Sequence, residues 1–172
     1  MPVREIITHP APVLRRKAHK VTIFGSDLQN LIDDMVETMR QAPGVGLAAP
    51  QVEVSARVIV VEYQEKDDEE DAPLKLFTVV NPEIARVSED TEIGTEGCLS
   101  IPGFVGDVER PYAVTVKGQN RHGKPVRIQA KGWLARIFQH EIDHLNGVLF
   151  IDRAIKVWKL QEEESNQVIA AD

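Results

Sequence analysis

The spacing of apolar and polar residues predicts a helix near each end of the chain, with short strands between them. Over 26–41, apolar residues recur every three or four positions, which is the period of an amphipathic helix. Ser26 and Gln29 have the spacing of a capping box, so we expect their side chains to satisfy free N–H groups where this helix begins. Pro43-Gly44 is expected to end it.

A second helical pattern extends from Gly132 to Leu145. Gly147 follows it at the position where a residue in the left-handed conformation often ends a helix. A further amphipathic stretch runs from about Arg153 to Glu163. We therefore expect a helical tail over about 153–172.

Between the helices, short runs rich in Val, Ile and Thr are typical of strands. These runs are 57–63, 76–80, 84–87, 91–95, 113–117 and 126–130. The last two flank Asn120–Lys124 and predict a hairpin. The acidic run 65–71 predicts a solvated loop, because like charges repel one another. Strands in the middle and helices at the ends indicate an α+β fold with mainly antiparallel strands.

Composition narrows the class of protein. The chain has 172 residues, of which 42% are hydrophobic and 27% charged, and this favours a single catalytic domain over 1–172. The formal net charge of −7 argues against non-specific binding to DNA, although local patches remain compatible with work at a ribosome. No run approaches the roughly 20 apolar residues of a membrane span. A lone cysteine favours a reducing compartment, and we expect the cytoplasm.

His140-Glu141-Ile142-Asp143-His144 forms the pattern H-E-x-x-H. On a helix, residues four apart lie on one face, so two imidazoles reach one metal ion and Glu141 lies beside it, where a water molecule would bind. The same letters also occur on solvated helices that bind nothing. Apolar residues around the motif instead predict a buried, central helix around which the strands pack. Ionisable groups on such a helix need partners, and a metal ion is a natural one.

Two histidines leave a catalytic site one ligand short, because such sites use three protein ligands and an open position. His9, His19 and His122 fall in predicted loops, so we interpret them as solvated. Cys98 is the better third ligand, since Glu96-Gly97-Cys98-Leu99-Ser100 contains a glycine that lets the backbone approach another element. The alternative is that Cys98 is a buried, inert thiol, which is common for free cysteines.

Three segments together resemble the signature motifs of peptide deformylase: 44–51 (GVGLAAPQ), 96–100 (EGCLS) and 139–147 (QHEIDHLNG). Their order and spacing match the family over about 2–155. The resemblance implies a hydrolase that removes the N-formyl group from the N-terminal methionine of nascent polypeptides and releases formate. It implies Fe²⁺, with Zn²⁺, Ni²⁺ or Co²⁺ as substitutes, whereas ligand chemistry alone favours zinc. N-formylmethionyl peptides are the implied partners, association with the ribosome is a further expectation, and no membrane or DNA partner is expected.

The resemblance also assigns roles to individual residues. Glu141 acts as general acid/base while a metal-bound water attacks the formyl carbon. The Gln51 side-chain amide and the Leu99 backbone N–H stabilise the oxyanion. The implied metal ligands are Cys98, His140 and His144.

The remaining expectations concern the substrate pocket and the residues behind the ligands. Val45, Leu99 and Ile137 are candidates for an apolar methionine pocket, and Gly46 for close backbone approach to substrate. Each of these residues fits ordinary core packing equally well. The resemblance pairs Arg110 with Asp143, which supports the ligating histidines; the alternative for Arg110 is a surface charge.

Two other functions share part of this pattern. A metalloprotease that cleaves internal peptide bonds would also use H-E-x-x-H, but a cysteine ligand is unusual there. A non-catalytic metal-binding module would have four protein ligands. Only three good ligands are evident in the sequence, which favours an open, catalytic position.

Overall fold

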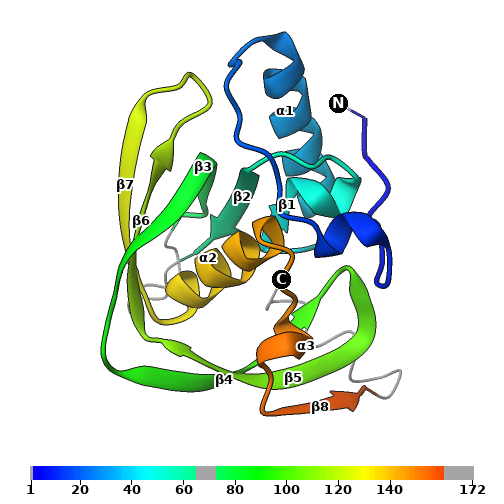
Figure 1. The fold of residues 1–172 in the computed structure, drawn as a ribbon, viewed down its shortest axis with the longest axis vertical. Coiled ribbons are helices and arrows are strands. Elements are labelled where there is room, and N and C mark those ends of the chain that lie inside the picture. Colours follow the sequence, from blue (N-terminus) through cyan, green and yellow to red (C-terminus); the bar gives the residue numbers. More distant parts are fainter. Residues whose placement is uncertain (1, 65–72, 161–172) are drawn as a thin grey trace.

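The computed structural model describes residues 2–64 and 73–160, which form a mixed α/β fold with mainly antiparallel strands (Figure 1). The helical segments are η1 (Pro12–Arg15), α1 (Ser26–Gln41), η2 (Ala49–Val52), α2 (Gly132–Leu145) and α3 (Phe150–Arg153). The strands are β1 (Gly46–Ala48), β2 (Val58–Tyr63), β3 (Lys75–Val87), β4 (Thr91–Cys98), β5 (Ile101–Pro111), β6 (Ala113–Gln119), β7 (Pro125–Lys131) and β8 (Lys156–Lys159). They form a five-stranded sheet in the order β1-β2-β3-β6-β7 and a three-stranded sheet in the order β4-β5-β8.

Strand β2 is buried on both faces because a helix covers each side of it. Val58 and Val60 pack in the cluster with α1, while Ile59 and Val61 pack in the cluster with α2. All four side chains have no exposed surface. This two-sided burial explains why the sequence of β2 is a continuous apolar run instead of an alternation of apolar and polar residues. Helix α2 contacts strands of both sheets, including β1, β2 and β5.

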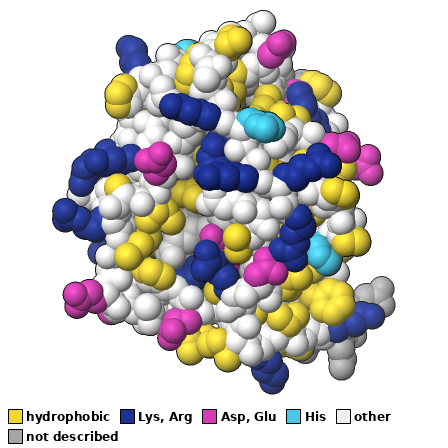
Figure 2. All heavy atoms as spheres, in the orientation of Figure 1, with side chains coloured by type: hydrophobic (Ala, Val, Ile, Leu, Met, Phe, Trp, Pro, Cys, Tyr) yellow, Lys and Arg dark blue, Asp and Glu magenta, His cyan; other side chains and the backbone are white. Residues whose placement is uncertain are grey.

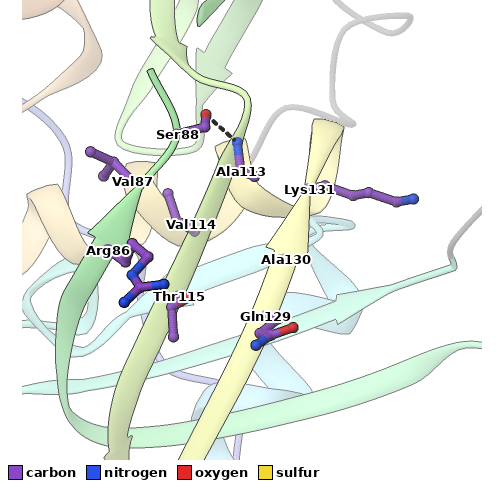
Figure 3. A pocket seen from close by; sticks show the side chains of 9 residues that line it. All are labelled: Arg86, Val87, Ser88, Ala113, Val114, Thr115, Gln129, Ala130 and Lys131. Carbon is purple, nitrogen blue, oxygen red and sulfur yellow. Dashed lines mark hydrogen bonds between the residues drawn. The ribbon is translucent and has the colours of Figure 1, made fainter. Parts of the chain in front are cut away.

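A groove lies where the end of β3 meets β6 and β7 (Figure 3). It is lined by Arg86–Ser88, Ala113–Thr115 and Gln129–Lys131. None of the residues that the sequence assigned to the active site lines this groove.

Basic side chains are spread over the face shown in Figure 2. Of the 27 acidic residues, ten fall in 65–72 and 161–172, whereas only one of the 20 basic residues does. The described residues therefore carry 19 basic against 17 acidic side chains, a formal charge of +2, although the whole chain carries −7. Among the described residues, no helix is both long and apolar enough to cross a membrane.

The helix over 26–41 is confirmed, but the predicted capping box is wrong. Gly25 is the N-cap residue and no side chain caps the first turn. Gln29 is held elsewhere: its Nε2 donates to the backbone oxygen of Arg121 at 2.7 Å, and its Oε1 accepts from Arg121 Nε at 2.6 Å. The side chain therefore ties α1 to the β6–β7 turn instead of closing its own helix.

The helical tail predicted from Arg153 is wrong where it is described. Helix α3 ends at Arg153, and Lys156–Lys159 form β8, which pairs with β5. The open edge of β5 offers backbone hydrogen bonds that an isolated short helix would lack. The rest of that prediction, over 161–172, and most of the predicted acidic loop, 65–71, lie outside the described residues.

Other strand predictions are confirmed with changes. The runs 76–80 and 84–87 belong to one strand, β3, whose pairing with β6 shifts register between them. The hairpin of β6 and β7 is present. Gly147 has φ +74°, as its position after α2 predicted. Its conformation is needed on packing grounds too, because a Cβ there would lie 2.6 Å from the Arg15 carbonyl oxygen.

Candidate active site

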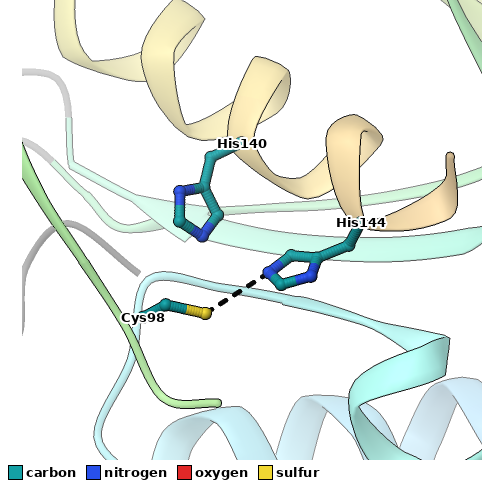
Figure 4. Close-up of side chains that lie close together, drawn as sticks. All are labelled: Cys98, His140 and His144. Carbon is teal, nitrogen blue, oxygen red and sulfur yellow. Dashed lines mark hydrogen bonds between the residues drawn. The ribbon is translucent and has the colours of Figure 1, made fainter. Parts of the chain in front are cut away.

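Cys98, His140 and His144 converge between the end of β4 and helix α2 (Figure 4). Their ligand atoms all lie within 4.8 Å of one another, and all three side chains are buried. Cys98 Sγ lies 3.4 Å from His144 Nε2. Burial and the nearby His140 lower the pKa of His144 well below its usual value, which favours the neutral imidazole that binds metals. One thiolate and two imidazoles form a donor set that suits zinc- or iron-type divalent ions.

Glu141 is fully buried beside these residues, against strand β1. A Cβ built on Gly46 would lie 2.5 Å from Glu141 Oε2 and 2.9 Å from its Cδ. No other side chain would leave the carboxylate in this position. The glycine is therefore required by the close approach of β1 to Glu141.

Gln51 lies in η2, directly after β1, and has no exposed surface. Its Oε1 accepts a hydrogen bond from the Ala48 N–H at 3.0 Å. Its Nε2 donates to Ser100 Oγ at 3.1 Å and lies 3.7 Å from Cys98 Sγ. These contacts fix the orientation of the amide, so its N–H groups face the cysteine.

The candidate pocket residues are divided between the two main hydrophobic clusters. Val45 is half-buried and packs against the cluster that contains Ile137, which is 1% exposed. Leu99 is half-buried and packs against the cluster that contains α1. Core packing therefore accounts for the burial of Ile137, while the side chains of Val45 and Leu99 retain accessible surface.

Glu96 is a buried carboxylate of β4 that contacts β5 and α2. Its oxygens accept hydrogen bonds from Arg110 Nε at 2.6 Å and Nη2 at 2.9 Å, and from Arg136 Nη1 at 2.6 Å. His140 Nδ1 lies 2.9 Å from Glu96 Oε1, which leaves Nε2 as the atom for a metal. Burial alone would raise the pKa of Glu96, but the hydrogen bonds from His140 and Arg110 outweigh it and hold the pKa well below its usual range. The charged carboxylate therefore fixes the ring of one candidate ligand.

Asp143 is the second carboxylate behind the candidate ligands. Arg110 Nη1 lies 3.0 Å from Asp143 Oδ2, so the predicted contact is present, and Arg110 is buried instead of being a surface charge. Arg153 adds two shorter bonds, Nε to Oδ2 at 2.6 Å and Nη2 to Oδ1 at 2.9 Å. Arg110 thus bridges Asp143 and Glu96.

Comparison with known proteins places this site in a family. Residues 3–159 match the family described as polypeptide deformylase. The chain belongs to the peptide deformylase family. The peptide deformylase of Halothermothrix orenii is 55% identical over 91% of this chain and 97% of its own length. The crystal structure of peptide deformylase from Thermotoga maritima superposes with a TM-score of 0.81 at 42% identity, covering 91% of this chain and 100% of that one.

A second solved structure is a Met-Ala-Ser-bound class I type b peptide deformylase from Acinetobacter baumannii. Its TM-score is 0.80 at 40% identity, and the match covers 89% of this chain and 100% of that one. The chain is therefore a metal-dependent hydrolase that removes the N-formyl group from the N-terminal methionine of nascent polypeptides and releases formate.

Sequence reasoning missed three charged residues of this deformylase's site: Glu96, Arg136 and Arg153. Glu96 lies in the EGCLS segment, but the segment gives no sign that this carboxylate forms buried ion pairs. Arg136 lies one helical turn before His140, on the same face, and this spacing could have indicated it. Arg153 gives no such signal, because a turn separates it from α2. His9, His19 and His122 are exposed, in agreement with their interpretation as solvated.

Proposed function

We propose that Cys98, His140 and His144 hold the catalytic metal of this deformylase and leave a coordination position open for reaction. The observation that carries the proposal is the convergence of three buried donor atoms within 4.8 Å. Within the described residues this cluster has three donors, where a closed structural site would use four. The open position distinguishes the proposal from a non-catalytic metal-binding module.

Glu141 is proposed as the general acid/base. A divalent ion bound here lowers the pKa of a coordinated water and polarises the formyl carbonyl. Glu141 is the neighbour of His140 on α2 and is held against Gly46, so its carboxylate lies beside the donor atoms. It accepts a proton from the attacking water and later donates it to the departing amine, which leaves formate and a free N-terminus.

Gln51 and Leu99 are proposed to stabilise the oxyanion that develops on the formyl group. The amide N–H groups of Gln51 already face Cys98, and two hydrogen bonds hold them there. Leu99 follows Cys98 directly, so its backbone N–H borders the same site. Donors that are oriented before the reaction cost no reorganisation during it.

The substrate peptide is proposed to bind along β1. Among the described strands it is at the edge of the five-stranded sheet and pairs with β2, so its other side supports the addition of a strand. Val45 and Gly46 lie at its start, and Ile137 faces the same cluster as Val45. The Acinetobacter baumannii relative was solved with Met-Ala-Ser bound, which supports a methionine tripeptide as the ligand of this surface.

We further propose that the metal is Fe²⁺, that the enzyme works in the cytoplasm and that it meets its substrates at the ribosome. Iron rests on the family resemblance, and a single thiolate ligand needs a reducing compartment. Anaerobic purification with metal analysis tests the iron assignment. Iron and a thiolate both oxidise in air, so activity should fall on exposure, and full air-stable activity with zinc would overturn it.

Residues 1–172 are proposed to act as one catalytic domain, with α2 as its central element. Leu134–Leu145 are buried without interruption, and α2 contacts both sheets, which supports this organisation.

The decisive assay measures formate release from formyl-Met-Ala-Ser, with acetyl-Met-Ala-Ser and an internal peptide as alternative substrates. Turnover of the formyl peptide alone is expected. Comparable cleavage of the internal peptide would favour the metalloprotease instead.

A further inference from the structure

An unbroken series of charged contacts connects an exposed arginine to a proposed metal ligand. Arg153, at the end of α3, binds Asp143 through two hydrogen bonds of 2.6 and 2.9 Å. Asp143 binds Arg110 at 3.0 Å, and Arg110 binds Glu96 at 2.6 and 2.9 Å. Glu96 lies 2.9 Å from His140 Nδ1. The side chain of Arg153 is 50% exposed, whereas those of Arg110 and Glu96 are 3% and 0% exposed.

The contact between Arg153 and Asp143 differs from an ordinary surface ion pair. Exposed pairs of long side chains usually contribute little. Here the acceptor, Asp143, is only 12% exposed, and the planar guanidinium engages both of its oxygens. Two-point contacts of this kind fix geometry as well as charge. Asp143 also lies between the two ligating histidines in sequence, so its position is coupled to the helical turn that carries them.

Arg110 is shared between two carboxylates. It donates two hydrogen bonds to Glu96 and one to Asp143. With Arg153 present, Asp143 has a second cation and needs only one bond from Arg110. Without Arg153, Asp143 would depend on Arg110 alone, and the guanidinium would be drawn from Glu96 toward Asp143.

We propose that Arg153 is a positioning residue of this deformylase. It holds Asp143, which keeps Arg110 on Glu96, and Glu96 in turn orients the His140 ring for the metal. The inference rests on the proposed ligands Cys98, His140 and His144. Loss of one partner behind a ligating histidine typically costs 10- to 100-fold in metal affinity or activity. Because Arg153 acts through Asp143 and Arg110, we expect the lower end, about 10-fold.

The chain offers a matched control that contacts the same short helix, α3, from η1. Arg15 forms an ion pair with Asp152 of α3, and its side chain is 39% exposed. Arg15→Met therefore removes an exposed guanidinium that contacts α3, and it leaves the contacts of Asp143 in place. The test compares the wild type with Arg153→Met, Arg153→Lys and Arg15→Met. Lysine keeps the charge of Arg153 but lacks its two-point geometry.

The measurement uses Co²⁺ alone as the probe. Each protein is loaded with Co²⁺, the thiolate-to-cobalt absorption band is recorded, and release of the ion to a chelator is timed. Arg153→Met is expected to release Co²⁺ about 10-fold faster than the wild type, with an altered band. The release rate of Arg153→Lys is expected to lie between those of Arg153→Met and the wild type, and the release rate of Arg15→Met is expected to match the wild type. Formate assays should show the loss in kcat more than in KM.

Equal release from Arg153→Met and Arg15→Met would overturn the inference. If Arg153→Met does not fold, as judged by its melting transition, the comparison of Arg153→Lys with Arg15→Met decides by the same criterion. Cys98→Ala separates this result from the site proposal itself. A Cys98→Ala protein that keeps the charge-transfer band would refute the ligand assignment, whatever Arg153 does.

Discussion

Replacing Gly46 by alanine tests whether the position of the Glu141 carboxylate controls the reaction. The new Cβ would lie 2.5 Å from Glu141 Oε2, about 0.9 Å inside the 3.4 Å at which ordinary contact begins. Strand β1 is fully buried and pairs with β2 through Gly46 and Val61, so it has little freedom to withdraw. We therefore expect Glu141 to move by most of that distance.

A displacement of about 1 Å in a reacting group can cost about 100-fold in rate. We expect Gly46→Ala to lower kcat for formyl-Met-Ala-Ser by this factor, which corresponds to about 2.7 kcal/mol of transition-state stabilisation. Metal content should be unchanged, because the three atoms nearest the new Cβ all belong to Glu141. The assays are formate release and metal analysis on the same preparation.

Gly25→Ala is the matched control. A Cβ at Gly25 meets only Ile23 Cγ2 at 3.8 Å, which is an ordinary contact. This variant should keep wild-type turnover. Near-normal activity of metal-loaded Gly46→Ala would refute the reasoning. It would show that turnover does not depend on the position of the Glu141 carboxylate, as acid/base catalysis requires. Loss of metal from Gly46→Ala would show that the effect spreads beyond Glu141.

Three further substitutions test the other roles. Glu141→Gln should keep its metal but lose about 10²–10⁴ in kcat, because the amide cannot carry the proton; normal turnover with metal bound would exclude the acid/base role. Gln51→Leu should lose about 10²–10³ in kcat as one oxyanion donor disappears, and a change confined to KM would contradict that role. Arg110→Ala should retain metal 10- to 100-fold less tightly and lower the free energy of unfolding by about 3–5 kcal/mol, since Glu96 and Asp143 lose a buried partner. Metal analysis and denaturant unfolding measure both effects, and unchanged metal content would reject the Arg110 prediction.

The parts of the fold that depend on local periodicity could be predicted from the sequence. Helix α1 and helix α2 follow from the spacing of their apolar residues, and β2 from its run of valine and isoleucine. Strand β5 was missed because Pro102, Gly103, Gly106 and Pro111 interrupt its apolar pattern. Its stability comes from pairing with β4 on one side and β8 on the other, which no local pattern records.

The same distinction applies to the site. The four-residue spacing of His140 and His144 is a property of one helix, so it was visible in the sequence. The contacts that Glu96 makes were not visible in the sequence, because its partners Arg110, Arg136 and His140 are 14, 40 and 44 residues away. A buried carboxylate with three such partners depends on how the three-stranded sheet and α2 come together.

The distribution of the site over distant segments also has a consequence for how the enzyme acquires its metal. Gln51 and Cys98 are 47 residues apart, and Cys98 and His144 are 46 apart. Contacts of this range close large loops, and the entropy of closing these loops makes such contacts slow to form. A newly made or partly unfolded chain therefore has the three proposed ligands but not their arrangement. If the proposed site is right, an ion would bind this arrangement more tightly than it binds the separate side chains of an unfolded chain, so free metal in solution would stabilise the folded enzyme by mass action.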